Sequence, residues 1–357
     1  MSSPIEFYRS SGGARIYRFP LELFPILKGF AYLVIAGEIV ALIDVGSGFG
    51  DSNGQLDAGI TALRTQFDEK IGWEDLTHIL ITHGHIDHFG GLHFVRERSN
   101  AKIGIHELDF KVLARYEERV AVTAKSLREY LIEAGVDQER REGIMNMYLF
   151  NKVFFSSLTP DFTFESVGMS LGPLRMFHVP GHCPGHVVIQ VDDVLFSGDH
   201  ILLDTSPHQA PERLTLNTGL EHYIASLNRT HDLGAECSQT FGGHGGVMND
   251  LRGRIDEILE VHQERLEQVS DLLDEPKTVV EVADALFPDV EGYDQLLALE
   301  ETGAHIEYLE QRGYLEIANE EDLERDSVVS IRYRRTTGLE GVSLPIRFRS
   351  EERNRRL

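Results

Sequence analysis

Three histidines and one aspartate lie within the six positions from His83 to His88, in the segment Thr-His-Gly-His-Ile-Asp-His. The apolar run before them, His78 to Thr82, is typical of a buried strand. Imidazole nitrogens and carboxylate oxygens are the ligands that zinc and similar divalent metals prefer. A loop at a strand end could turn His83 and His85 toward one metal ion, and Asp87 and His88 toward a second. The segment therefore favours a fold that gathers strand ends around metal ions.

The same arrangement recurs at three later positions, where an apolar strand and a glycine-containing turn lead to one further candidate ligand each. Glycine before each ligand lets the backbone turn sharply near a metal ion. One such motif is weak evidence, whereas four strand-end motifs in a single chain predict a metal cage. The candidate ligands are His83, His85, Asp87, His88, His182, Asp199 and His244.

In order and approximate spacing, these motifs resemble those of the metallo-β-lactamase superfamily, and the resemblance covers residues 13–273. The matching segments are Ile43 to Gly48, Thr82 to His88, Pro180 to His182, Gly198-Asp199 and Gly243-His244. The resemblance implies an α+β fold, a four-layer αββα sandwich with the metals at one edge of its two sheets. It is specific for the fold and the metal cage but not for a substrate.

The resemblance also implies how the ligands divide between two divalent metal ions. The implied ligands are His83, His85 and His182 for the first ion, Asp87, His88 and His244 for the second, and Asp199 as a bridge between both. Zinc is the expected metal, with iron and manganese as alternatives. Asp87 would also orient a metal-bound hydroxide. Asp44 resembles the family's buried aspartate, which supports the ligand loops through hydrogen bonds instead of binding metal.

Two residues near His182 are expected to have other roles. His186 lies four positions beyond it, and we expect it to support the ligands or to pack against them. Cys183 follows the ligand directly, and we expect it to be a small core residue.

The pattern along the chain predicts two domains. Residues 1–273 form the expected catalytic domain, with a helical insertion at 107–160 that is broken near Gly135. The insertion could be a pair of core-packed helices or a cover over the active site. The break at Asp274-Glu-Pro276 begins a second domain at 274–357, which ends in a charged tail expected to be frayed.

The second domain resembles the winged-helix domain appended to a subgroup of these hydrolases. Thr278 is expected to cap a helix, and a further helix is expected from Tyr293 to Arg312. A hairpin of Tyr314 to Ile317 with Val328 to Tyr333 would enclose an acidic loop at 320–326. This acidity argues against DNA binding, so we expect a packing role or a homodimer contact.

The charge and cysteine content limit the classes of partner and the cellular location that we expect. The formal net charge is −24, which repels phosphate backbones and anionic membranes and argues against a nucleic-acid partner. Two cysteines indicate a reducing compartment, and neither a secretion signal nor a membrane span is evident, so a cytoplasmic location is expected.

Together these features predict a dinuclear metallohydrolase that acts on a small-molecule carbonyl ester, most plausibly a thioester or lactone. The general similarity is to the glyoxalase II-like branch, although a basic glutathione-binding segment is absent from the sequence. One alternative is a nuclease or phosphodiesterase on single-stranded RNA, and another is a mononuclear iron oxidoreductase on the same fold. β-Lactamase activity is a third alternative.

Overall fold

The structure is a computed structural model of the chain, and it describes residues 5–150, 155–325 and 328–336. The chain divides into two compact units, each assembled from three segments. The first unit comprises Met1–Arg119, Val153–Pro207 and Thr230–Arg254, and the second comprises Val120–Lys152, His208–Arg229 and Ile255–Leu357. The expected domain boundary at 273/274 stays a prediction. The frayed tail lies outside the described residues, as do residues 151–154 of the expected insertion.

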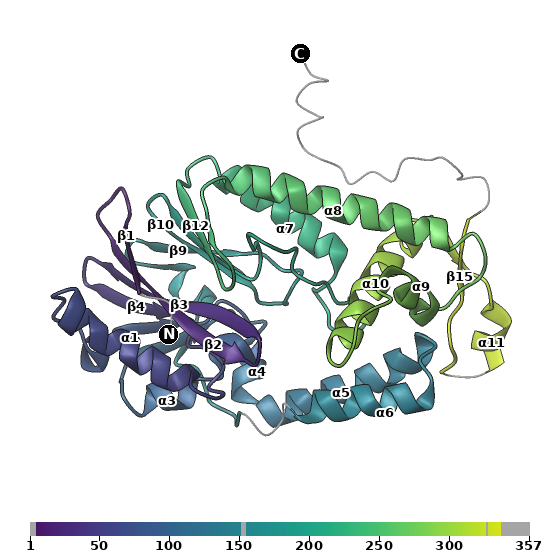
Figure 1. The fold of residues 1–357 in the computed structure, drawn as a ribbon, viewed down its shortest axis with the longest axis horizontal. Coiled ribbons are helices and arrows are strands. Elements are labelled where there is room, and N and C mark those ends of the chain that lie inside the picture. The colour runs from purple at the N-terminus through teal and green to yellow at the C-terminus, as the bar shows by residue number, and fades with distance from the viewer. Residues whose placement is uncertain (1–4, 151–154, 326–327, 337–357) are drawn as a thin grey trace, which may run out of the picture. The chain divides into compact units, whose positions relative to one another are not determined.

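The first unit contains two large sheets (Figure 1). The first sheet has its strands in chain order, antiparallel from β1 to β4 and parallel from β4 to β7. Its strands are β1 Glu6–Arg9, β2 Arg15–Phe24, β3 Leu27–Ala36, β4 Ile39–Ile43, β5 His78–Leu80, β6 Lys102–Ile105 and β7 Phe162–Thr163. The second sheet has the order β13-β12-β11-β10-β9-β8, with one parallel pair, β11 and β12. Its strands are β8 Ser170–Leu171, β9 Leu174–His178, β10 Val187–Val191, β11 Val194–Gly198, β12 Gln239–Gly242 and β13 Val247–Met248.

Apolar side chains from both sheets form one shared core. Alternate residues of a strand point to opposite faces, so Ile16 and Val34 of the first sheet meet Ile189 and Phe196 of the second. The Tyr32 ring packs 5.2 Å from that of Phe196, centroid to centroid. Burying one such apolar side chain contributes about 1.5–3 kcal/mol. These contacts fix the two sheets face to face and bring their strand ends to a common edge.

Short helices accompany the sheets in the first unit. They are α1 Ser52–Gln66, α2 Ile86–Phe89, α3 Leu92–Arg96, α4 Phe110–Ala114 and the 3₁₀ turns Trp73–Asp75 and Glu165–Val167. The buried face of α1 carries Leu56, Ile60 and Leu63, and a side chain at Gly59 would strike the Phe19 ring of β2. The expected α+β sandwich of two sheets with outer helices is thus confirmed. Strand β7 ends at Thr163, and the 3₁₀ turn Glu165–Val167 follows it.

The second unit is mainly helical. Its helices, three of which begin or end in the first unit, are α5 Tyr116–Glu133, α6 Gln138–Phe150, α7 Leu220–Leu233, α8 Leu251–Leu272, α9 Val279–Leu286, α10 Asp294–Glu310 and α11 Glu320–Arg325. The break expected near Gly135 separates α5 from α6, where Gly135 has a φ of +82°. The expected cap is also confirmed, because the Thr278 side chain accepts a hydrogen bond from the Glu281 backbone.

The expected C-terminal hairpin forms with altered limits. Strands β14 Leu315–Ile317 and β15 Tyr333–Arg335 pair antiparallel, so the second strand begins where the sequence pattern predicted its end. The predicted acidic loop is wrong in part, because Glu320 to Arg325 form α11. Consecutive acidic residues in a first helical turn are favoured by the helix dipole, which a pattern search for loops overlooks.

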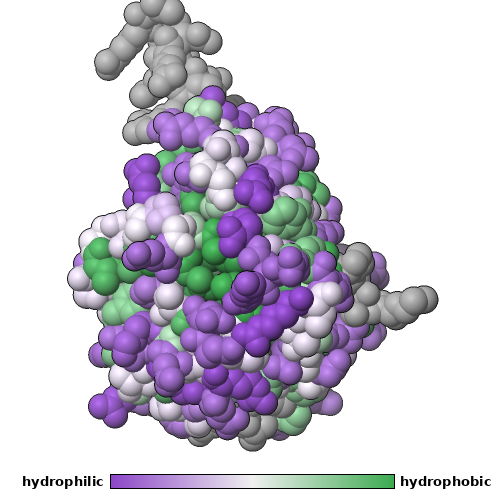
Figure 2. All heavy atoms as spheres, turned by 90° about the vertical axis from the view of Figure 1, so that its left-hand side faces the viewer, coloured by the Kyte–Doolittle hydropathy of each residue, from purple (hydrophilic) through white to green (hydrophobic). Residues whose placement is uncertain are grey.

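The surface of the molecule reflects its charged composition. The face shown in Figure 2 is largely hydrophilic, and apolar side chains gather mainly near its centre, with smaller groups elsewhere. Within the described part of the chain, no helix has the length and apolar character needed to cross a membrane.

Candidate metal centre

All seven candidate ligands lie just beyond the ends of four strands of the first unit. His83 and His85 follow β5, His182 follows β9, Asp199 follows β11 and His244 follows β12, while Asp87 and His88 lie on α2 next to His85. They form two groups, and within each group one donor atom per residue lies within 4.8 Å of the others. The first donor group is His83, His85, His182 and Cys183; the second donor group is Asp87, His88, Asp199 and His244. The structure therefore brings together every residue that the sequence motifs singled out as a ligand.

Asp199 belongs to the second donor group but also faces the first. Its Oδ2 is 3.3 Å from His244 Nε2 and 3.4 Å from His88 Nε2, both in the second group. The same oxygen is 4.0 Å from His182 Nε2 of the first group. His182 Nε2 is in turn 3.0 Å from His85 Nδ1 of that group. One carboxylate thus faces nitrogens of both groups, as the expected bridging role requires.

Several buried nitrogen and oxygen atoms of the two donor groups have no hydrogen-bond partner, as expected of atoms that bind a metal ion. His83 Nε2, His88 Nε2 and Asp199 Oδ1 are buried and receive no hydrogen bond. Buried polar atoms without partners cost about 1–3 kcal/mol each, so three of them at one point indicate a ligand. Nitrogen and carboxylate oxygen donors suit zinc, iron or manganese. The residues present therefore fit two divalent cations.

The electrostatics of the two groups differ. Burial lowers the pKa of His83 well below its usual range, and the imidazole of His88 lowers it further. Burial also acts to lower the pKa of His244, but the Asp199 and Asp87 carboxylates raise it to about 10. Burial also acts to lower the pKa of His88, but the carboxylates around it, Asp199 first among them, raise that pKa well above its usual value. His83 of the first group is therefore neutral at neutral pH. His88 and His244 of the second group lie where positive charge is stabilised, and a bound cation could supply that charge in place of protons.

Asp44 holds the ligand segment from behind. Its Oδ1 accepts a hydrogen bond from the Thr82 backbone at 2.8 Å, and its Oδ2 is 2.8 Å from both the Thr82 hydroxyl and His88 Nδ1. The Thr82 hydroxyl is in turn 3.0 Å from Nδ1 of His83. Asp44 thus orients one imidazole of each donor group and leaves their Nε2 atoms to face the site, as its expected supporting role requires.

Glycines make room for the ligands. A Cβ built on Gly243 would lie 2.3 Å from Asp199 Oδ1 and 2.6 Å from a ring carbon of His88. Gly198, directly before Asp199, has a φ of +50°, a conformation that costs other residues free energy. The glycine preceding these ligands is therefore needed for close approach as well as for turning.

His186 and Cys183 lie beside the ligands. His186 Nε2 accepts a hydrogen bond from the Asp199 backbone at 3.1 Å, and its ring stacks on that of His83 with centroids 4.5 Å apart. These contacts are those of a supporting residue. Cys183 is buried, and burial raises the pKa of its thiol well above the usual range, which is typical of a core cysteine. Its position in the first donor group was not expected from the sequence.

Sequence reasoning missed Asp109. The side chain is fully buried, and its carboxylate accepts hydrogen bonds from the backbones of Gly84 at 2.8 Å and Gly185 at 2.9 Å. Burial raises its pKa to about 6. The available signal was its place four residues after the end of β6, at the same sheet edge as the ligands. Its local sequence instead suggests an ordinary helix cap.

The second unit holds a third histidine-containing group, formed by His262, Glu301 and His305. His262 Nδ1 is 3.1 Å from His305 Nε2, and His305 Nδ1 is 2.7 Å from the Glu301 carbonyl. The Glu301 carboxylate accepts hydrogen bonds from Arg265 at 2.9 Å and from the Gln209 backbone at 2.7 Å. These contacts occupy His262 Nδ1, both ring nitrogens of His305 and the Glu301 carboxylate, and His262 Nε2 is buried without a hydrogen-bond partner. Because the atoms that face one another are hydrogen-bonded, we interpret the group as a hydrogen-bonded network of the core.

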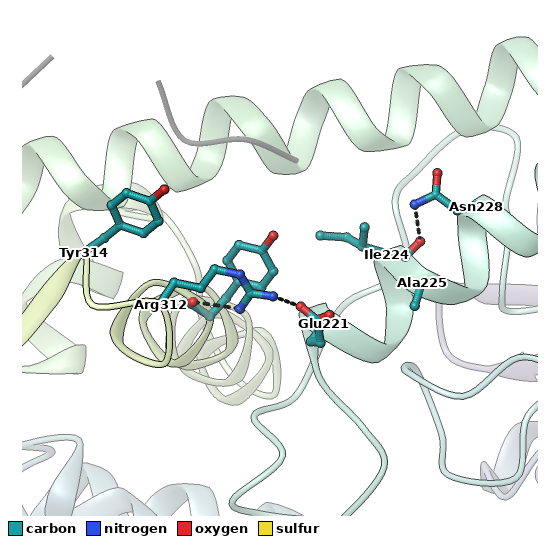
Figure 3. A pocket seen from close by; sticks show the side chains of 7 residues that line it. Glu221, Ile224, Ala225, Asn228, Arg312 and Tyr314 are labelled. Carbon is teal, nitrogen blue, oxygen red and sulfur yellow. Dashed lines mark hydrogen bonds and ion pairs between the residues drawn. The ribbon is translucent and has the colours of Figure 1, made fainter. Parts of the chain in front are cut away.

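A cavity of about 540 Å³ also lies in the second unit (Figure 3). The Arg312 guanidinium stacks 3.5 Å above the Tyr308 ring centroid and pairs with Glu221. The other residues that line the cavity are Ile224, Ala225, Asn228 and Tyr314. None of the seven lining residues is a histidine or cysteine, so the cavity lacks the nitrogen and sulfur donors that the candidate metal centre in the first unit has.

Comparison with known proteins agrees with this geometry. A family model described as the metallo-beta-lactamase superfamily matches residues 25–275. The probable metallo-hydrolase YqjP of Bacillus subtilis is 25% identical over 288 residues, which are 78% of this chain and 86% of that protein.

Two solved structures share the fold over most of the chain. A metallo-beta-lactamase family protein from Thermus thermophilus has a TM-score of 0.70 and 26% identity, and the match covers 90% of this chain and 98% of that one. A beta-lactamase domain protein from Burkholderia ambifaria has a TM-score of 0.67 and 19% identity, with coverage of 93% and 94%. Both similarities extend beyond the residues that the family model matches.

Proposed function

The chain belongs to the metallo-beta-lactamase superfamily, and from this premise we propose that it is a dinuclear metal-dependent hydrolase of a small carbonyl ester. Membership supports metal-dependent hydrolysis in general, as does the similarity to a probable metallo-hydrolase. The observation that carries the dinuclear assignment is the Asp199 carboxylate, whose Oδ2 faces nitrogens of both donor groups at 3.3–4.0 Å.

In this proposal each donor group holds one ion, with Asp199 shared. His83, His85 and His182 would hold the first ion, and Asp87, His88 and His244 would hold the second. Zinc is the proposed metal, because nitrogen and carboxylate oxygen donors suit it. When bound, the two ions would supply Lewis-acid chemistry and would make water nucleophilic at neutral pH.

The chain's own residues would position the reacting water. Asp87 Oδ2 lies 3.3 Å from His244 Nε2 and 3.6 Å from His88 Nε2, at the side of the second donor group. Ionised, it can only accept hydrogen bonds, so it would orient a water whose proton it accepts. Burial acts to raise the pKa of Asp87, but His88 and His244 lower it to about 2, which keeps the carboxylate ionised at neutral pH.

Charge supports a carbonyl ester over a phosphodiester as the substrate. The chain carries a formal net charge of −24, which disfavours approach of a polyanionic RNA strand. A thioester or lactone has no such penalty, and its carbonyl offers the electrophile that this chemistry needs. We therefore propose one of these two ester types as the substrate class.

The first test combines metal analysis with a substrate panel. Protein purified without added metal is expected to contain two zinc equivalents and to hydrolyse thioesters or lactones. His85→Ala and His244→Ala should each lower the metal content by about one equivalent and lower kcat/KM by at least about 100-fold. His222→Ala, a histidine of the second unit paired with Glu212, is the matched control and should change neither.

Other results would redirect the assignment. Cleavage of phosphodiesters or single-stranded RNA without ester turnover would contradict the ester proposal. A single iron equivalent without hydrolysis would contradict the dinuclear hydrolase itself. Full turnover in the two ligand variants, with their metal content verified, would remove these residues from the site.

The C-terminal part of the chain is proposed to pack or dimerise as a winged-helix-like element. Its helices α9 and α10, followed by the paired strands β14 and β15, support this interpretation. Light scattering at micromolar concentration tests the homodimer, and a monomeric mass would contradict it. A cytoplasmic location stays part of the proposal.

A further inference from the structure

Asp109 joins two loops that belong to different strands. Its Oδ2 accepts the N–H of Gly84, which lies between His83 and His85, at 2.8 Å. Its Oδ1 accepts the N–H of Gly185, three residues after His182, at 2.9 Å. The three histidines of the first donor group are therefore carried by two loops that a single carboxylate connects.

We propose that Asp109 is a positioning residue that sets the separation of these loops and so the affinity of the first donor group for its metal ion. This inference rests on the proposed metal site. It assigns Asp109 no contact with the metal or the substrate, because both of its carboxylate oxygens are directed at backbone N–H groups.

The orientation of the side chain argues against a role as a helix cap. Asp109 directly precedes α4, a position where aspartate commonly accepts a hydrogen bond from the first turn of its own helix. The structure shows no such capping bond for Asp109. Its oxygens bind loops far along the chain, at Gly84 and Gly185. The helix start therefore provides a fixed base from which the side chain reaches the ligand loops.

The fit between the carboxylate and the loops is close. A Cβ on Gly84 would lie 3.2 Å from the carboxyl carbon of Asp109, and a Cβ on Gly185 would lie 2.7 Å from it. The second distance is shorter than side chains tolerate, so Gly185 has room only for hydrogen. Glycine at these positions lets both N–H groups approach one carboxylate.

The chemistry requires a carboxylate and not merely a polar side chain. Asp109 is fully buried, and an ionised carboxylate is costly there unless its oxygens accept hydrogen bonds. Asparagine has the same shape but only one acceptor oxygen, and its NH₂ group would face one of the two N–H donors. Asp109→Asn should therefore release one loop while it preserves the packing volume.

The decisive measurement is the affinity of each metal equivalent. Full-length protein would be stripped, reloaded with zinc and titrated against a chelator of known affinity, with circular dichroism and thermal unfolding as checks on the fold. The equivalent that His85→Ala abolishes identifies the first donor group. Asp109→Asn is expected to weaken that equivalent by about 10–100-fold and to leave the other within about threefold. Saturating zinc should restore most of kcat.

A second variant keeps the test valid if Asp109→Asn folds poorly. Gly185→Ala retains the carboxylate but pushes it away from the loop, and it should weaken the same equivalent. Asp44→Asn is the matched comparison, because Asp44 bonds His88 directly and its loss should weaken the second equivalent at least as much as the first.

Three results would overturn the inference. They are unchanged affinity of the first equivalent in Asp109→Asn, equal weakening of both equivalents, or a loss of activity that zinc does not restore. Failure of the proposed function has a different signature, because wild-type protein would then bind zinc without hydrolysing any ester. In that case the effect of Asp109→Asn on zinc affinity still decides whether Asp109 positions the loops.

Discussion

Replacing Glu301 by glutamine should destabilise the second unit substantially. The Glu301 carboxylate is buried, with its side chain 7% exposed, and it accepts hydrogen bonds from Arg265 and from the Gln209 backbone. Glutamine can accept one of these bonds but presents an NH₂ group to the other donor. It also leaves the Arg265 guanidinium without its charged partner.

The expected cost follows from these contacts. Hydrogen bonds to a charged group contribute about 1.5–3 kcal/mol each, and breaking a buried ion pair by removing one partner costs about 3–5 kcal/mol. The Arg265 side chain is 24% exposed, so water recovers part of this loss. We therefore expect Glu301→Gln to lower the free energy of unfolding by about 2–4 kcal/mol.

Urea unfolding followed by far-ultraviolet circular dichroism measures this change. Glu300→Gln is the matched control, because Glu300 precedes Glu301 on α10 and pairs with His208 at 3.0 Å, where the two side chains are 16% and 26% exposed. It should cost less than about 1 kcal/mol. Equal effects of the two variants, or a Glu301→Gln loss below about 0.5 kcal/mol, would refute the reasoning. A zinc-dependent recovery of Glu301→Gln would contradict the interpretation of this group as a metal-free network.

The remaining predictions concern the metal centre and acid stability. Gly243→Ala places a Cβ against Asp199 and His88, so we expect at least a tenfold loss of zinc affinity, measured by chelator competition. Asp44→Asn should lower kcat at limiting zinc but less at saturating zinc, and an equal loss at both would contradict a supporting role. Burial lowers the pKa of His262 to about 3, so the unfolded chain takes up a proton below about pH 6.5 while the folded chain does not. The contribution of His262 to the free energy of unfolding is therefore complete above that pH and falls by about 2 kcal/mol between pH 7 and 5. His262→Asn should lose less stability than the wild-type protein over this pH range. Urea midpoints that fall equally with pH in both proteins would disprove this prediction.

The grouping of the candidate ligands was predictable because each one is encoded locally. His83 follows an apolar strand directly, and His182, Asp199 and His244 each follow an apolar strand and a tight turn. Strands of a two-sheet sandwich end at a common edge. Short-range sequence patterns therefore carry long-range information at this edge. The same reasoning extends to Asp44, which stands at the end of β4 beside β5.

The unpredicted features depend on contacts between distant residues. The partners of Asp109 are 25 and 76 positions away, and its surroundings in sequence are those of a helix start. His262 and His305 lie on separate helices, 43 positions apart, where each is one histidine on a helix face. The helix at Glu320 to Arg325 was missed for another reason, because a dense acidic run is typical of loops as well as of a helical first turn.

The position of Asp199 has a thermodynamic consequence for metal binding. Its Oδ2 faces nitrogens of both donor groups, so the free energies of binding the two ions are coupled. Coupling is reciprocal: the factor by which one ion changes the affinity for the other holds in both directions. Substitution of Asp199 should therefore weaken both equivalents together, whereas substitution of His85 or His244 acts mainly on one. A titration of the wild-type protein accordingly gives two stepwise affinities, and each of them includes the coupling between the two ions.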